Sequence, residues 1–335
     1  MADRPLSVLM SQALIAFTIE FDNEFERRMP HRTSLARGGT GPWLTSMTMW
    51  ANFVRLVPPD GVPLRTMAPS GAITNLDGLR RWGYIDISDG VIRLTRNGAA
   101  ARSIWDPLAA EIERRWRDRF GGDRIGRLIA ALAPRTGPAV PRFLPVVPFS
   151  TGMRSDRLAG VPGYVADDLI SHLAQALLAL TIEYEQRSRL SLPMTADLVR
   201  VLDSAGVEVR DMPRRSGVSK EAIASALKFL AKRDLVTMTS ASGSNSARLT
   251  ERGVDAQAQY RSLITTIEAG WTGVDEIRAA IPAGDELALG LEPPPDGWRA
   301  QRPYASQTAA VLADPAAALP HHPMVLHRGG YPDGS

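Results

Sequence analysis

The chain contains no cysteine among its 335 residues, which excludes disulfide bonds, thiol nucleophiles and cysteine-ligated metals. No run approaches the roughly 18 consecutive apolar residues that a membrane-spanning helix needs. The N-terminal stretch is amphipathic, rich in glutamate and unlike a secretory signal, so we expect a cytoplasmic protein with no membrane partner. The net charge of +3 is too small to indicate nucleic acid by itself, so the distribution of charge must decide.

The composition that remains is typical of a folded chain. Hydrophobic residues make up 44% of the sequence and charged residues 22%, which excludes a largely disordered protein. A length of 335 residues favours two domains, or one domain with large additions, and is ample for a sizeable core.

Three blocks of sequence occur twice in the same order. The pairs are Ser11–Phe21 with Ala174–Tyr184, Ala51–Met67 with Ala196–Met212, and Arg93–Trp116 with Arg248–Trp271. The first pair is identical at seven of eleven positions. We infer a duplicated domain, with copy 1 at residues 1–133 and copy 2 at residues 166–285.

Two segments rich in proline and glycine lie outside the copies, at residues 134–165 and 286–335. Such composition is typical of a disordered linker and tail. Apolar residues embedded in both segments leave open a second interpretation, in which each segment docks on the surface as an arm.

The apolar spacing of copy 2 predicts a definite order of elements. A long amphipathic helix covers residues 173–184, a second follows at 195–204, and a short helix opens at Val207. Residues 216–219 supply a turn, with Ser219 as the expected N-cap of a helix at 220–232. Strands at 235–239 and 247–250 flank a loop at 240–246, and a last long helix follows Arg252-Gly253.

The stretch SGVSKEAIASALKFLAKRDLV, followed by this hairpin and by LTERG at 249–253, resembles the MarR family of bacterial regulators. The resemblance covers most of copy 2 and, more loosely, copy 1. It implies a mainly α fold with small β-wings (α+β), in which two tandem winged-helix domains form an intramolecular pseudo-dimer. Members of the family are usually dimers of single-domain chains, joined by their first and last helices.

Basic residues concentrate around the helix at 220–232. All three lysines of the chain lie on it, and residues 206–252 carry nine basic against five acidic residues. Helical spacing predicts that Lys220, Ala224, Ser225 and Lys228 point away from the apolar stripe, where side chains reach the edges of bases in a major groove. A solvated basic helix face is the alternative interpretation. The expected DNA-binding residues are Arg210, Arg214, Arg215, Ser219, Lys220, Ser225, Lys228, Lys232, Asn245 and Arg248.

The wing of copy 2 departs from the family's pattern. MarR-type wings usually carry an Asp and an Arg at the tip, and the Arg enters the minor groove. Residues 240–246 of this chain hold no charge, which leaves Asn245 as a weak substitute, and Arg248 is the next charged residue.

Copy 1 is less suited than copy 2 to sequence-specific binding of DNA. Eight residues separate Met67 from Leu76, whereas fourteen separate the corresponding Met212 from Leu227, a loss of roughly one and a half helical turns. Residues 70–78 hold no basic side chain. We expect a tight Asp89-Gly90 hairpin in place of a long wing, and no sequence-specific reading of DNA by this copy. The alternative interpretation is that copy 1 reads DNA through another surface.

An insertion of eighteen residues in copy 1, around residues 31–49, offers a candidate pocket for a small aromatic or anionic effector. Trp43 and Trp50 would form stacking walls, and Arg32 or Arg37 would pair with an anion. A packed loop with core tryptophans is the alternative interpretation.

No arrangement of residues predicts catalysis. The Gly-rich run at 38–41 lacks the Lys and Ser/Thr of a phosphate loop, and no Ser/His/Asp arrangement can be argued from spacing. His321, His322 and His327 lie together without nearby carboxylates, which favours docked or exposed residues over metal ligands. We therefore expect no enzyme, no cofactor and no metal.

Two functions remain. The first is a DNA-binding transcriptional regulator whose partner is double-stranded DNA and which responds to a small effector. We expect it to self-associate into a homodimer, because one chain holds one helix-turn-helix competent to read DNA sequence. The second is a small-molecule or protein-interaction module that has kept the scaffold and left DNA.

Overall fold

The computed structural model describes residues 4–29, 57–67, 76–81, 83–135, 168–218, 220–241, 244–295, 297–302 and 304–323. Its helices are α1 (Leu6–Arg28), α3 (Leu64–Met67), α4 (Leu76–Arg81), α5 (Arg96–Trp105), α6 (Leu108–Phe120), α7 (Gly122–Leu132), α8 (Leu169–Arg187), α9 (Asp197–Val201), α10 (Met212–Ser216), α11 (Lys220–Lys232), α12 (Glu251–Ala269), α13 (Val274–Ala280), α14 (Ala305–Ala313) and α15 (Pro315–Ala318). Its strands are β1 (Val62–Pro63), β2 (Ile85–Ser88), β3 (Val91–Leu94), β4 (Val207–Glu208), β5 (Val236–Ala241) and β6 (Ser244–Leu249). The chain is therefore mostly helical with small antiparallel sheets, which confirms the α+β class.

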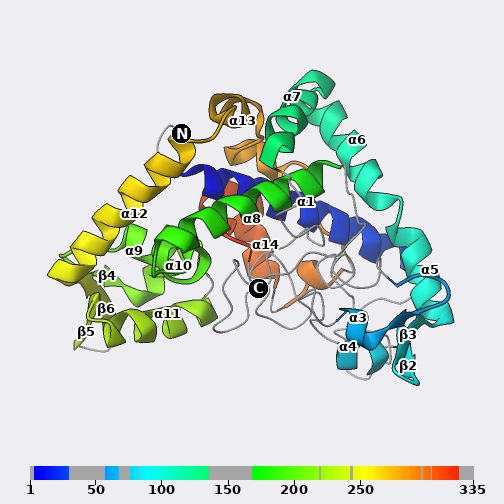
Figure 1. Ribbon diagram of the computed structural model, residues 1–335, viewed down its shortest axis with the longest axis horizontal. Coiled ribbons are helices and arrows are strands. Elements are labelled where there is room, and N and C mark those ends of the chain that lie inside the picture. The colour runs from blue at the N-terminus through cyan, green and yellow to red at the C-terminus, as the bar shows by residue number, and fades with distance from the viewer. Residues whose placement is uncertain are drawn as a thin grey trace.

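The two copies arrange their strands identically. Each sheet is antiparallel with the hairpin's second strand in the middle, in the order β1-β3-β2 in copy 1 and β4-β6-β5 in copy 2. A long helix precedes each sheet, α1 or α8, and helices follow it, α5 and α6 or the longer α12. The sheets occupy opposite lower corners of the molecule, with α1 and α8 between them above (Figure 1).

The repeated sequence RLT-x-x-G makes the same junction between hairpin and helix twice. The Thr95 side chain accepts from the Gly98 backbone N–H at 3.0 Å, and the Thr250 side chain accepts from that of Gly253 at 3.1 Å, so each threonine caps the following helix. A Cβ at Gly98 would overlap the carbonyl oxygen of Tyr84, and one at Gly253 would overlap that of Leu235. Each of these carbonyls belongs to the residue before the first strand of the hairpin. The similarity of the copies therefore extends to individual hydrogen bonds.

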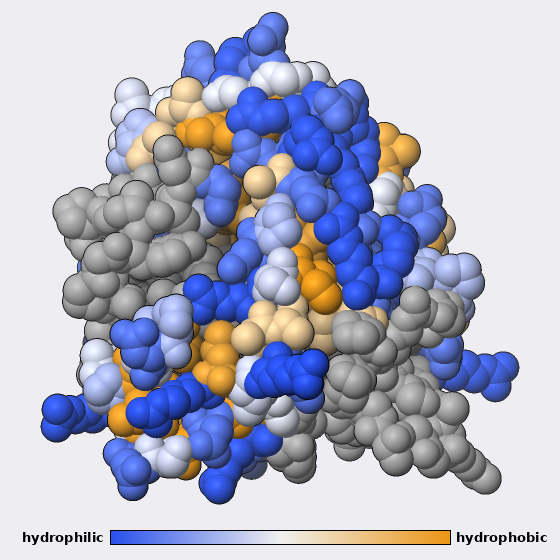
Figure 2. Space-filling view, turned by 90° about the vertical axis from the view of Figure 1, so that its right-hand side faces the viewer, coloured by the Kyte–Doolittle hydropathy of each residue, from blue (hydrophilic) through white to orange (hydrophobic). Residues whose placement is uncertain are grey.

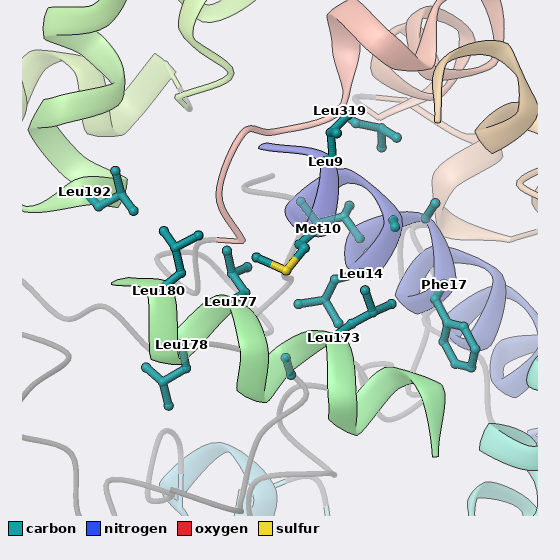
Figure 3. Close-up of a cluster of buried hydrophobic side chains, with 14 of the residues drawn as sticks. Leu9, Met10, Leu14, Phe17, Leu173, Leu177, Leu178, Leu180, Leu192 and Leu319 are labelled. Carbon is teal, nitrogen blue, oxygen red and sulfur yellow. The ribbon is translucent and has the colours of Figure 1, made fainter. Parts of the chain in front are cut away.

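The core lies where the first helices of the two copies meet. The contact between α1 and α8 is the most extensive between two helices in the described part of the chain. Met10 and Leu14 of α1 point toward Leu173 and Leu177 of α8, and all four are fully buried (Figure 3). At roughly 1.5 to 3 kcal/mol for each buried side chain of this size, this shared interface is a major source of stability.

The final short helices of the copies also pack on each other, α7 against α13. Arg124 of α7 forms a bidentate pair with Glu286, at 2.7 and 2.9 Å, and donates to the carbonyl of Ala280 at 2.9 Å. The segment after residue 286 is thereby joined to both copies where it begins. It continues into α14 and α15 with buried apolar side chains, so its described part is a docked arm.

In each copy a tryptophan is bound to the first helix through an equivalent glutamate. Trp116 Nε1 donates to Glu20 at 3.0 Å, and Trp271 Nε1 donates to Glu183 at 3.0 Å. Glu20 is 4% exposed and also accepts from Arg119, whereas Glu183 is 31% exposed and pairs with Arg187. The two bonds match in geometry and differ in burial.

This difference predicts unequal costs for the same substitution. We expect Glu20→Ala to lower the free energy of unfolding by about 2–4 kcal/mol, because it strands a buried indole N–H and a partly buried guanidinium. We expect Glu183→Ala to cost about 1 kcal/mol or less, because water takes the place of the missing partner. Urea unfolding followed by circular dichroism measures both values, and equal costs would contradict the burial argument.

Four local predictions were wrong. The helix predicted at 195–204 begins earlier, in the turn Leu192–Ala196, and ends at Val201 because Leu202 is extended. Val207 opens a strand instead of a helix. The last helix of copy 2 begins at Glu251, not after Gly253, because Thr250 is its cap. The loop predicted at 240–246 is largely strand, since pairing continues to Ala241↔Ser244.

Candidate nucleic-acid interface

The candidate interface is built on the turn between α10 and α11. Gly217 ends α10 in the left-handed conformation, with φ of 60°, which glycine adopts without steric penalty. The Ser216 hydroxyl donates to the Met212 carbonyl at 2.7 Å and accepts from the Val218 N–H at 3.2 Å. These bonds fix the direction in which α11 leaves the turn. Ser219, the predicted N-cap, lies outside the described residues.

The two faces of α11 differ sharply in chemistry. Its inward face is buried and apolar, as the spacing predicts, and consists of Ala222, Ile223, Ala226, Leu227 and Leu230. The outward face is exposed and carries Lys220, Ala224, Ser225, Lys228 and Lys232. Because the lysines and Ala224 are spaced by four residues, they form one row along the helix. Small side chains between long basic ones leave the helix backbone accessible to a large anionic partner.

The flanking arginines lie on the same part of copy 2. Arg210, Arg214 and Arg215 are exposed. Neither they nor the three lysines form a salt bridge with another residue in the described ranges. Arg233 lies over the Phe229 ring, 4.3 Å from its centroid, and extends the basic surface beyond the end of α11. The positive charge of this surface is therefore not neutralised by the described part of the chain.

The wing beside α11 is a longer hairpin than the sequence predicts. Asn245 pairs with Ser240 and Arg248 with Thr237, and all four residues are exposed. The exposed positions are otherwise hydroxyl-bearing or apolar, and Met238 is 43% exposed. The wing thus offers hydrogen-bonding groups and a single arginine near its base.

A groove of about 710 Å³ continues the basic surface behind α11. It lies between the end of α8, the end of α11 and the first turns of α12. Five of its lining side chains are basic and two acidic, and these are Arg187, Arg189, Lys232, Arg233 and Arg252 with Asp234 and Asp255. Arg252 pairs with Asp234 at 3.7 Å, so part of this charge is compensated.

Copy 1 lacks an equivalent surface in its described part. Three exposed acidic residues, Asp77, Asp86 and Asp89, lie among its exposed arginines. The hairpin closes at Asp89-Gly90 with φ of 53° and 69°, as the sequence predicts. The side of the molecule that copy 1 forms presents mostly hydrophilic side chains with small hydrophobic areas between them (Figure 2).

The arginines of α6 in copy 1 are largely paired. Arg28 of α1 holds Glu111 at 2.5 Å, and Arg117 holds Glu113 at 2.8 Å. The hydrogen bond from Arg28 lowers the pKa of Glu111. The helix α6 therefore differs from α11, whose lysines form no salt bridge with the described residues, although copy 1 also exposes arginines such as Arg80 and Arg93.

The candidate effector pocket of copy 1 falls in a part of the chain that the structure does not describe. Arg32, Arg37, Trp43 and Trp50, the expected effector contacts, lie outside the described residues. Across the residues that are described, no group of three His, Asp or Glu side chains is placed to hold a metal ion. No described helix combines the length and apolarity required to cross a bilayer.

Sequence reasoning missed a buried polar network behind the interface. Asp197 and Arg200 of α9 are 3.4 Å apart, and Arg200 also contacts Nδ1 of His321 from the arm. Burial raises the pKa of Asp197 to about 7, and burial, helped by Arg200 and Arg4, lowers the pKa of His321 to about 3. Tyr184 and Tyr260 border the network with rings 5.9 Å apart, and burial raises both pKa values. No local pattern places His321 beside Arg200.

This network predicts how stability depends on pH. Burial lowers the pKa of His322 to about 3, like that of His321, against 6.5 for an ordinary histidine. Near pH 5, unfolding therefore protonates both imidazoles and releases the proton of Asp197, whose ordinary value is 3.8. Because unfolding takes up about one proton, the free energy of unfolding falls by about 1 kcal/mol as the pH is lowered from 6 to 5.

The control for this prediction is His322→Leu, which removes one of the two imidazoles. Proton uptake by His321 and release by Asp197 then cancel, so we expect the free energy of unfolding to stay nearly constant between pH 6 and 5. Urea unfolding at half-unit pH steps measures both profiles. Glu111 and Glu286 do not interfere, because hydrogen bonds from Arg28 and Arg124 keep their pKa values below the ordinary 4.5. An unchanged slope in the variant would contradict the assignment.

No protein-family model, curated protein or solved structure matches the chain.

Proposed function

We propose that the chain is a DNA-binding transcriptional regulator built from two tandem winged-helix units of MarR type, which form a pseudo-dimer within one chain. The observation that carries this proposal is the row of exposed lysines on α11 above a buried apolar face, which form no salt bridge with the described residues. The matching element order of the two copies and the packing of α1 on α8 support the pseudo-dimer.

In this proposal α11 enters the major groove with its outward face. Lys220, near the helix N-terminus, and Lys228 contact phosphates or the acceptor atoms of guanine, and Ser225 contacts a base edge. Arg210, Arg214 and Arg215 neutralise phosphates beside the groove, where released counterions contribute to affinity. The wing lies along the DNA backbone, which Asn245 and Arg248 contact.

One chain then carries one competent reader. Recognition of a palindromic site requires two chains, whereas a single chain reads a short asymmetric site. Sizing the protein–DNA complex by light scattering distinguishes the two modes. A single chain bound to a full inverted repeat would contradict the single-reader assignment.

The function itself is tested by fluorescence anisotropy with the duplex upstream of the chain's own gene and a scrambled duplex, each at two salt concentrations. We expect a preference for the native duplex that persists at the higher salt, because nonspecific phosphate binding weakens steeply there. Absence of binding to either duplex at low salt would overturn the proposal and favour the interaction module.

A further inference from the structure

The described part of the C-terminal arm ends between the first helices of the two copies and the turn that precedes α11. Leu319, Pro320, His321 and His322 follow α15 outside any helix or strand and are all buried. No secondary structure pairs these residues, so specific contacts must hold them in place. The contacts fall into two groups, one to the central helices and one to the turn that precedes α11.

The first group joins the arm to the central helices. Gln12 of α1 donates through Nε2 to the carbonyls of Ala316 and Leu319, both at 3.0 Å, and the Ser11 hydroxyl donates to the Pro320 carbonyl at 3.2 Å. His322 Nε2 lies 3.5 Å from the Thr181 hydroxyl of α8. The arm thus contacts the first helix of each copy.

The second group joins the arm to the turn before α11. The backbone N–H of His321 donates to the Gly217 carbonyl at 3.3 Å. The His321 backbone and ring lie so close to Gly217 that a Cβ there would overlap both. Arg200, paired with the buried Asp197, contacts Nδ1 of the same ring. Because guanidinium only donates, Nδ1 accepts, and the ring is held neutral.

The outward face of α11 remains exposed with the arm in place. The described part of the arm therefore lies behind α11 and leaves its outward face uncovered. The position of Gly217 fixes where α11 begins, so a residue that holds this turn sets the orientation of the row of lysines.

We propose that His321 is a positioning residue for the reader, through which the strap Leu319–His322 couples the orientation of α11 to the helices α1 and α8. The coupling is a property of the free chain, and its consequence for DNA rests on the proposed function. A displaced strap leaves α11 folded but free to vary in orientation, which lowers affinity without removing any group that contacts DNA.

The test compares His321→Ala with His321→Asn in the full chain. Asn places its Oδ1 near the position of Nδ1 and keeps an acceptor for Arg200, whereas Ala keeps only the backbone bond. The first readout is amide hydrogen exchange over residues 212–223 without DNA. We expect exchange at least fivefold faster in His321→Ala and near wild type in His321→Asn. Gln12→Ala, which removes the bonds from α1 to the carbonyls of Ala316 and Leu319 and keeps that of Ser11, provides a second variant with the same expected direction.

The second readout is affinity for a duplex that wild type prefers, at 20 °C, where circular dichroism shows each variant folded. We expect roughly tenfold weaker binding by His321→Ala and rescue to within threefold by His321→Asn. Leu128→Ala, a buried truncation in α7, is the control for general destabilisation and leaves affinity unchanged.

Unchanged exchange in both His321→Ala and Gln12→Ala would contradict the proposal that the strap holds the turn before α11. Faster exchange with unchanged affinity would overturn its positioning role. A wild-type chain that prefers no duplex refutes the proposed function, and exchange alone then decides whether the strap exists.

Discussion

Lys220→Ala combined with Lys228→Ala is expected to weaken specific DNA binding by about 30-fold or more while the protein remains folded. Each lysine that contacts a phosphate or a base edge contributes about 1–3 kcal/mol. Both side chains are exposed and form no salt bridge with the described residues, so their removal leaves no buried partner unsatisfied. The slope of log affinity against log salt is expected to fall by about one for each phosphate that the variant no longer neutralises. Anisotropy titrations at four salt concentrations measure both effects.

The matched control removes two positive charges from copy 1. Arg80→Ala with Arg93→Ala changes the net charge equally, and both arginines are exposed. We expect this variant to bind within about threefold of wild type. An equal loss of affinity in the two double variants would show a general electrostatic effect and would contradict reading by α11.

Leu177→Ala is expected to lower the free energy of unfolding by about 2–5 kcal/mol, the usual cost of truncating a leucine in a well-packed core. Leu177 is fully buried on α8, where it faces α1 of the other copy (Figure 3). Leu14 holds the equivalent position on α1, so Leu14→Ala is expected to cost a similar amount. Urea unfolding monitored by tryptophan fluorescence and by circular dichroism measures the cost.

The same experiment tests whether the copies share one core. If they do, both probes follow a single transition in wild type and in each variant. Leu289→Ala is the surface control, because Leu289 is 52% exposed, and its effect is expected to stay within about 0.5 kcal/mol. Two separated transitions, with Leu177→Ala shifting one of them, would contradict the shared core.

The elements that the sequence predicts correctly are those set by strong local patterns. The apolar residues Ile223, Leu227 and Leu230 recur at helical spacing, and the structure buries all three on one face of α11. The Asp89-Gly90 turn is equally local, because few residues other than Gly, Asn and Asp adopt the positive φ it requires. The outward direction of Lys220 and Lys228 follows from the helix geometry alone.

The elements that were predicted wrongly depend on partners distant in sequence. Ser, Asn and Gly have low strand propensity, so residues 240–246 indicate a loop, yet burial of Ala247 and Leu249 fixes a register that extends pairing to Ser244. The strap is a stronger example. His321 contacts Arg200 across more than a hundred residues of chain, and no spacing rule connects them.

The most direct test of the central claim is selection of duplexes from a random-sequence pool by the full chain, in parallel with the Lys220→Ala, Lys228→Ala double variant. We expect that wild type enriches a defined motif and that the double variant enriches none while retaining the wild-type circular dichroism spectrum. Failure of wild type to enrich any motif, or enrichment of the same motif by both proteins, would contradict the claim that α11 reads DNA sequence.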